Sequence, residues 1–127
     1  MTIAEWCVPG ALFLYLATIG LPKALAWRTF DNDNPRAPGF YSEGWRARAL
    51  GAHQNGIEAF PFFAFAVLLT EFRQAPQAAL DHLAILFLVL RLAYVALYLL
   101  GWGWVRSAVW SAGLAVNLLI FLLPLWH

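Results

Sequence analysis

The sequence contains little charge for its size. Only 12% of its 127 residues are charged, whereas 62% are hydrophobic. An average soluble domain is about 25% charged and 45–50% apolar. A chain this short cannot bury so much apolar surface in its own interior, because small domains leave a large share of their surface outside. The remaining apolar surface must therefore face lipid or other subunits. The formal net charge of +1 gives no sign of a nucleic-acid partner, and we expect none.

Cysteine and metal motifs are also scarce. The one cysteine, Cys7, excludes an intrachain disulfide, and no activating neighbour stands beside it, so we interpret it as a small apolar residue. The three histidines are scattered, which argues against a metal site, and we interpret His53 as structural. The sequence has no glycine-rich phosphate loop, nucleophile elbow or zinc motif.

Long apolar stretches make up most of the chain. They run from about Ile3 to Trp27, Glu43 to Phe72, Gln77 to Gly101 and Ser107 to Trp126. Each is near or above the ~20 residues that a spanning helix needs. Lipid offers the backbone no hydrogen-bond partners, so segments that cross it should be helical. We therefore predict an all-α integral membrane four-helix bundle, formed by a single domain over residues 1–127. The first stretch lacks the basic start of a signal peptide.

The connections between these stretches differ in length and charge. A polar loop covers 28–42, and short turns at 73–76 and 102–106 imply antiparallel neighbours. The basic residues near the first and third connections are Lys23, Arg28, Arg36, Arg46, Arg48 and Arg106. Only Arg73 lies near the second. The positive-inside rule then predicts that the 28–42 and 102–106 loops are cytoplasmic. We expect a bacterial inner membrane, with an internal eukaryotic membrane as the alternative.

The second stretch carries polar residues at helical spacing. Arg48, Gly51, Asn55 and Glu58 are separated by three, four and three positions, which places them on one helix face. Glu58 should lie well below the membrane surface, where a carboxylate is costly unless it is paired or faces water. Pro61 follows one turn later, and we expect it to kink or loosen the helix.

The third stretch carries a matching series, Arg91, Tyr94 and Tyr98. Arg91 falls near the middle of its segment, and the natural partner of a buried guanidinium is a buried carboxylate. We therefore predict that Arg91 pairs with Glu58, within a subunit or across subunits. A role limited to fixing the helix register is the alternative for this pair.

Two interpretations stay open for Arg106 and Ser107. Arg106 is either a topogenic arginine that extends toward lipid phosphates or a clamp for an anion or thiolate, since a guanidinium favours the charged form of sulfur. Ser107 either donates a hydrogen bond to the same sulfur or caps the helix.

Taken together, these residues resemble the membrane-associated proteins in eicosanoid and glutathione metabolism, the MAPEG family, in a bacterial-type member. The resemblance rests on the run Arg48–Pro61 with its Asn-x-x-Glu core, on Arg91–Tyr94 and Tyr98, and on Arg106-Ser107. It extends over nearly the whole chain.

The resemblance implies a homotrimer that binds glutathione between neighbouring subunits, near the cytoplasmic side. The implied activity is a glutathione-dependent membrane transferase or peroxidase acting on lipophilic electrophiles. Glu58 would hold the amino end of the peptide, and Arg106, assisted by Ser107, would face the thiolate. The implied glutathione contacts are Arg48, Asn55, Glu58, Arg91, Tyr94 and Tyr98.

The sequence also departs from the family's well-known enzymes. They have arginine where this chain has Gly51 and Gln54, often histidine at Tyr94, and tyrosine at Trp110. Two lost cations should weaken binding of an anionic tripeptide. At about 1.5–3 kcal/mol for each hydrogen bond to a charged group, affinity could fall from micromolar toward millimolar. A non-catalytic accessory subunit of a larger membrane complex, or a lipid-binding scaffold, is the alternative function.

Overall fold

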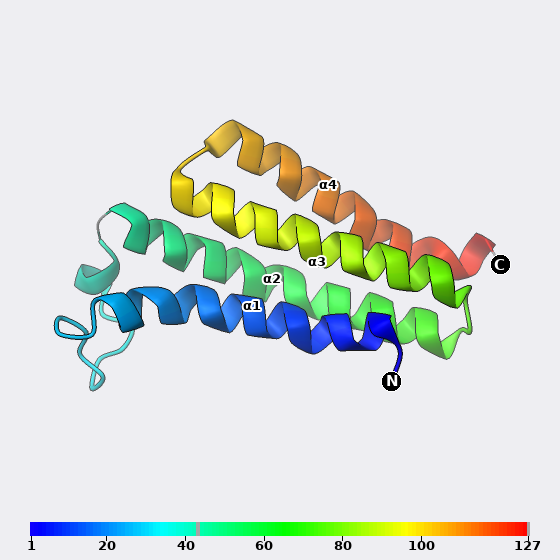
Figure 1. Ribbon diagram of the computed structural model, residues 1–127, viewed down its shortest axis with the longest axis horizontal. Coiled ribbons are helices and arrows are strands. Elements are labelled where there is room, and N and C mark those ends of the chain that lie inside the picture. The colour runs from blue at the N-terminus through cyan, green and yellow to red at the C-terminus, as the bar shows by residue number, and fades with distance from the viewer. Residues whose placement is uncertain (43, 127) are drawn as a thin grey trace.

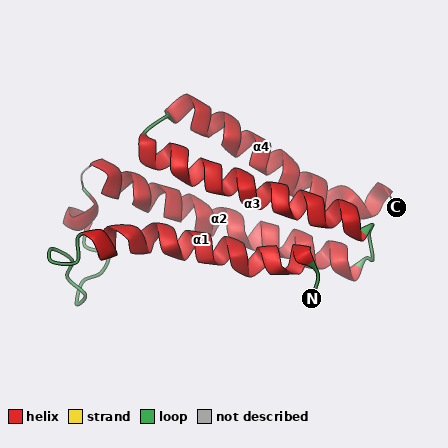
Figure 2. Ribbon diagram, in the orientation of Figure 1, coloured by secondary structure: helices red, strands yellow, loops and turns green. Residues whose placement is uncertain are grey.

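The computed structural model describes residues 1–42 and 44–126, and within them every regular element is helical (Figure 2). The long helices are α1 (Ile3–Leu25), α2 (Gly44–Phe72), α3 (Gln77–Leu100) and α4 (Gly103–Leu122). Two short 3-10 helices, η1 (Pro38–Tyr41) and η2 (Leu123–Trp126), lie in the first loop and after α4. All four long helices have the length and hydropathy of membrane spans. The predicted all-α fold with four spans is confirmed.

The helices lie lengthwise against one another, and helices adjacent in sequence are antiparallel (Figure 1). Both α2 and α3 pack against all of the other long helices, whereas α1 and α4 lie on opposite sides of the bundle. The α1–α2 loop and the α3–α4 turn share one end of the bundle, and both ends of the chain lie at the other (Figure 1). The connections richest in arginine and lysine therefore lie at the same end of the bundle.

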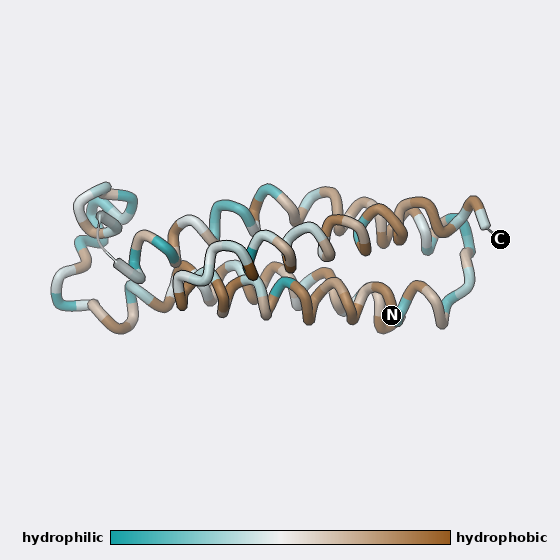
Figure 3. Tube along the Cα trace, turned by 90° about the horizontal axis from the view of Figure 1, so that it is seen from above, coloured by the Kyte–Doolittle hydropathy of each residue, from teal (hydrophilic) through white to brown (hydrophobic). Residues whose placement is uncertain are grey.

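Hydrophobic residues make up most of the length of the helices (Figure 3), and they are found both buried in the bundle and exposed on its outside. Phe63 and Phe87 stack at the centre with ring centroids 4.2 Å apart. The helices approach closely because small residues line their contacts, as is usual between membrane helices. The fully buried alanines are Ala4, Ala11, Ala49, Ala52, Ala66 and Ala84. On the outside, Phe13 is 74% exposed and Leu92 is 58% exposed, as expected for a surface in contact with lipid.

One predicted connection is wrong. Residues 102–106 are mostly helical, because α4 begins at Gly103 rather than at Ser107. Gly101 ends α3 with a φ of 79°, a conformation that glycine adopts without steric cost. The Arg106 N–H then already donates to the Trp102 carbonyl. Arg106 and Ser107 thus lie within the first turns of α4 instead of in a loop.

Other boundaries differ by a residue or two. Helix α1 ends at Leu25 rather than Trp27, and α3 ends at Leu100 rather than Gly101. Glu43, where we expected the second segment to begin, lies outside the described residues. Helix α2 continues through Pro61 to Phe72, so this proline does not end it; a kink there stays a prediction.

Candidate functional site

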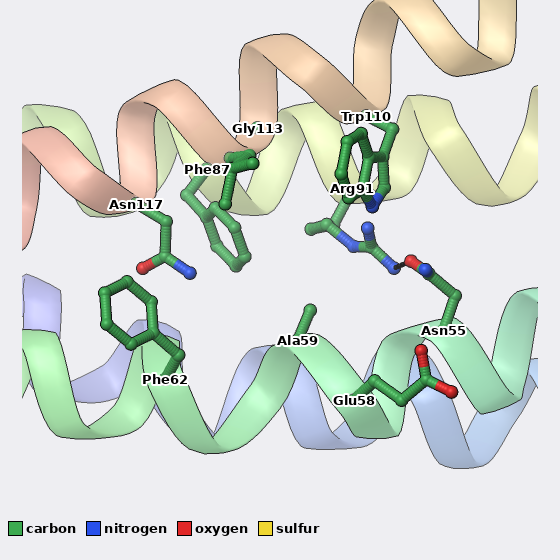
Figure 4. Close-up of a pocket in the computed structure, with 10 residues that line it drawn as sticks. Asn55, Glu58, Ala59, Phe62, Phe87, Arg91, Trp110, Gly113 and Asn117 are labelled. Atoms are coloured by element: carbon green, nitrogen blue, oxygen red, sulfur yellow. Dashed lines mark hydrogen bonds between the residues drawn. The ribbon is translucent and has the colours of Figure 1, made fainter.

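A cavity of about 220 Å³ lies among α2, α3 and α4 (Figure 4). Helix α2 contributes Asn55 and Glu58, α3 contributes Arg91, and α4 contributes Trp110 and Asn117. Its other lining residues are apolar or glycine: Ala59, Phe62, Phe87, Gly113 and Leu114. Three of the residues predicted for the site, Asn55, Glu58 and Arg91, therefore line one cavity.

Arg91 is the most buried charged residue of this cavity, with only 3% of its surface exposed. Its Nη2 donates to Asn55 Oδ1 at 2.9 Å, and its guanidinium carbon lies 4.2 Å from the centroid of the Tyr94 ring. The centroid of the Tyr15 ring, on α1, lies 5.7 Å from the same guanidinium carbon. The buried Nε has no hydrogen-bond partner among the described residues. Aromatic faces and one amide thus stabilise the charge, and the Nε donor stays available.

The predicted pair of Arg91 and Glu58 does not form within this subunit. Arg91 bonds to Asn55 instead, and no hydrogen bond joins it to Glu58 (Figure 4). Three residues advance a helix by about 300°, so Glu58 is turned away from Asn55 by roughly 60°. Glu58 is exposed at the rim of the cavity as a result. Pairing across subunits stays a prediction.

A second set of contacts joins Tyr98 to Arg106. The Arg106 guanidinium carbon lies 4.3 Å from the centroid of the Tyr98 ring. Tyr98 in turn meets Tyr94 edge to face, with centroids 5.7 Å apart. Together with the Arg91 contacts, these form one continuous series from Arg106 on α4, through α3, to Asn55 on α2. We call it the aromatic–arginine series: Arg106, Tyr98, Tyr94, Arg91 and Asn55.

Arg48 lies beside this series rather than within it. Its Nε donates to the Leu99 carbonyl at 2.9 Å. That carbonyl belongs to the last turn of α3, where helix carbonyls lack partners within the helix. Arg48 therefore joins α2 to the end of α3, and its guanidinium lies beside Gly101 in the α3–α4 turn.

Ser107 is not brought into the series. It is exposed, and its Oγ donates to the Gly103 carbonyl at 3.1 Å. The predicted helix cap is wrong, because Trp102 occupies the N-cap position and makes no side-chain cap bond. A hydrogen bond from Ser107 to sulfur stays a prediction.

The positions that depart from the family pattern have distinct surroundings. Gly51 packs so closely on Tyr98 that a Cβ atom there would overlap the tyrosine hydroxyl. Gln54 is exposed on the outer face of α2. Trp110 lines the cavity and is 40% exposed. No cation from positions 51 or 54 therefore enters the cavity.

The sequence reasoning missed Asn117. This residue is 3% exposed, and within 1–42 and 44–126 its buried Oδ1 has no hydrogen-bond partner. The available signal was a single amide in the otherwise apolar stretch Gly113–Leu123.

His53 has the structural role that we expected, since its Nδ1 lies 2.8 Å from the Tyr15 carbonyl.

Over the described ranges 1–42 and 44–126, no group of three or more metal-binding side chains comes together. The site instead offers buried and half-buried guanidinium groups, an exposed carboxylate and amide groups. Such a set can bind and orient an anionic peptide and stabilise a negatively charged sulfur.

Comparison with known proteins places the chain in a family. No curated protein and no solved structure matches it. The model of the MAPEG family, however, matches residues 3–126, which is nearly the whole sequence. The chain therefore belongs to the MAPEG family.

Proposed function

We propose that the protein is a glutathione-dependent membrane transferase or peroxidase that acts on lipophilic electrophiles. The observation that carries this proposal is the position of Arg106 over Tyr98, at one end of the aromatic–arginine series. Through this series, cations from α3 and α4 and the amide of Asn55 surround one region of the bundle.

The chain's residues suit the charges of glutathione. The free Nε of Arg91 and the remaining donors of Arg48 can bind carboxylates. Glu58 is an exposed carboxylate at the rim of the cavity and can hold an ammonium group. Arg106 provides the positive charge that favours a thiolate over a thiol.

The size of the cavity supports an oligomeric site. Ligand pockets usually enclose about 300–1,000 Å³, and this one has about 220 Å³. A tripeptide would extend beyond it, onto the exposed face of α2 that carries Gln54 and Glu58. We propose that a neighbouring copy in a homotrimer covers that face. Each subunit of the trimer would be a single domain over residues 1–127.

When bound, glutathione supplies the sulfur nucleophile. In the transferase reaction a carbon–sulfur bond forms as the leaving group departs with its electron pair. In the peroxidase reaction two glutathiones are oxidised to the disulfide, and the hydroperoxide is reduced to an alcohol and water. In both reactions Arg106 lowers the energy of the anionic sulfur, and the bilayer presents the apolar substrate.

One observation favours the alternative of a non-catalytic accessory subunit or lipid-binding scaffold. Tyr98 fills the space beside Gly51. This chain therefore has an aromatic contact at the position where the family's well-known enzymes have an arginine. A protein that kept the fold without binding an anionic peptide would tolerate this exchange.

Calorimetric titration of glutathione into the purified protein in detergent tests the proposal. We expect saturable binding with a Kd of about 1 mM or below. Arg106→Ala should weaken it at least tenfold, whereas Arg73→Ala, at the opposite end of the bundle, should leave it unchanged. Absence of binding at tens of millimolar would favour the scaffold. Native mass spectrometry on the same sample tests the trimer.

We further propose that the end of the bundle bearing 28–42 and 102–106 faces the cytoplasm of a bacterial inner membrane. The excess of basic residues at that end supports this orientation. Reporter fusions after Asn34 and after Gln74 should give opposite topology signals, and equal signals would contradict the orientation.

A further inference from the structure

A second hollow lies apart from the candidate site, where α1 ends and α2 begins. It has about 280 Å³ and is lined by Leu25, Ala26, Trp27, Arg28, Thr29 and Arg46. None of these residues belongs to the aromatic–arginine series or to the cavity beside it. We call it the loop-end hollow.

Three cations gather around the loop-end hollow, each held on an aromatic ring. Arg28 lies 5.4 Å from the centroid of Trp27, and Arg46 lies 4.8 Å from that of Phe40. Lys23, one turn before Trp27, lies 5.3 Å from the centroid of Phe30. An aromatic face positions a cation without cancelling its charge, so the hollow stays positively charged.

The position of the hollow points to the membrane interface. It adjoins the last turn of a spanning helix, and Trp27 is 67% exposed there. Tryptophan is enriched at the level of lipid headgroups. Just inside, Leu25 and Leu21 are 68% and 40% exposed, which gives acyl chains an apolar surface directly below the cations.

We infer that the loop-end hollow binds the phosphate group of an anionic phospholipid. Two arginines line the hollow and can contact phosphate oxygens with several N–H donors, and Lys23 adds charge nearby. The headgroup of a zwitterionic lipid also carries a positive group, which these cations repel, so such a lipid should bind less tightly. Asp31 and Asp33 lie in the same loop but do not line the hollow. This inference does not depend on glutathione binding.

Native mass spectrometry tests this inference. The delipidated protein is mixed with equal amounts of phosphatidylglycerol and phosphatidylcholine that have the same acyl chains, and we expect it to retain phosphatidylglycerol in preference. A basic residue near a membrane surface contributes roughly a fivefold preference for anionic lipid. Removing both arginines in Arg28→Gln/Arg46→Gln should therefore reduce retention of phosphatidylglycerol about 25-fold. Arg28→Lys/Arg46→Lys should retain most of it, because the charge is kept.

Arg73→Gln is the matched control, since Arg73 is exposed at the opposite end of the bundle. Equal retention of both lipids by the unmodified protein, or an equal loss in Arg73→Gln, would overturn the inference. Displacement of the lipid by an equal concentration of inorganic phosphate would overturn the lipid assignment and leave a free-phosphate site. If the double variant does not fold, Arg28→Gln alone carries the test with a fivefold loss, because Arg28 is exposed.

Discussion

Gly51 on α2 and Tyr98 on α3 are in such close contact that the tyrosine hydroxyl and ring edge occupy the space of a side chain at position 51. The guanidinium of Arg106 lies over the ring face of the same tyrosine. The absence of a side chain at position 51 therefore sets where Tyr98 lies, and Tyr98 sets where Arg106 lies.

Gly51→Ala should destabilise the protein. The new methyl group must displace Tyr98, and overpacking of this kind costs about 1–3 kcal/mol. Gly20→Ala is the matched control, because nothing lies within 4 Å of a Cβ at that helical position. Alanine there should be neutral or stabilise by up to about 1 kcal/mol. Thermal unfolding in detergent compares the two, and equal melting temperatures would show that the Gly51–Tyr98 contact is looser than the structure has it.

The bond from Arg91 to Asn55 leads to a second prediction. Asn55→Leu removes the acceptor of a buried cation and should cost about 1.5–3 kcal/mol. Asn32→Leu, at an exposed amide in the α1–α2 loop, should change stability by less than about 0.5 kcal/mol. If Arg91→Met is added to Asn55→Leu, the two costs should not add, because the second change removes the cation that the first left unpaired. Strict additivity would mean that the two residues do not interact.

Much of the fold could be predicted from sequence, since lipid imposes simple rules on length and composition. A spanning segment must be helical and near 20 residues long, so α1, α2 and α3 were placed to within one or two residues. The start of α4 was missed because only Gly101 and Trp102 separate α3 from α4. Hydropathy reports where a segment enters lipid, whereas 103–106 is already helical backbone.

The site was predictable only in part. Spacing along α2 predicted that Asn55 and Glu58 share a helix face, and both line the cavity. A shared face, however, does not fix which residue meets Arg91. The choice of Asn55 over Glu58 depends on the rotation of α2 against α3. The Gly51–Tyr98 contact likewise depends on how closely the two helices approach. The spacing of residues along the sequence predicts neither the rotation of one helix against another nor the distance between them.

Asn117 allows a prediction of opposite sign. Its Oδ1 is buried without a partner, and a buried unpaired polar group costs about 1–3 kcal/mol. Asn117→Leu keeps the branched shape of the side chain, and its larger methyl groups can extend into the cavity that Asn117 lines. It should therefore raise the melting temperature in detergent. Asn117→Asp should lower it, because a carboxylate is harder to bury than an amide. A loss of stability in Asn117→Leu would reveal that the amide has a partner in the assembled protein.

Tyr98 supports Arg106 through the face of its aromatic ring. Because the guanidinium rests on the ring face, the ring matters more for its position than the hydroxyl does. A cation–π contact contributes about 0.5–2 kcal/mol. Tyr98→Leu should therefore weaken glutathione binding about 2- to 30-fold, whereas Tyr98→Phe should weaken it less than about twofold if the hydroxyl has no role of its own. Titration of both variants by calorimetry separates these roles. An equal loss in Tyr98→Phe would assign the effect to the hydroxyl as a direct ligand contact, and the ring would then not be what positions Arg106.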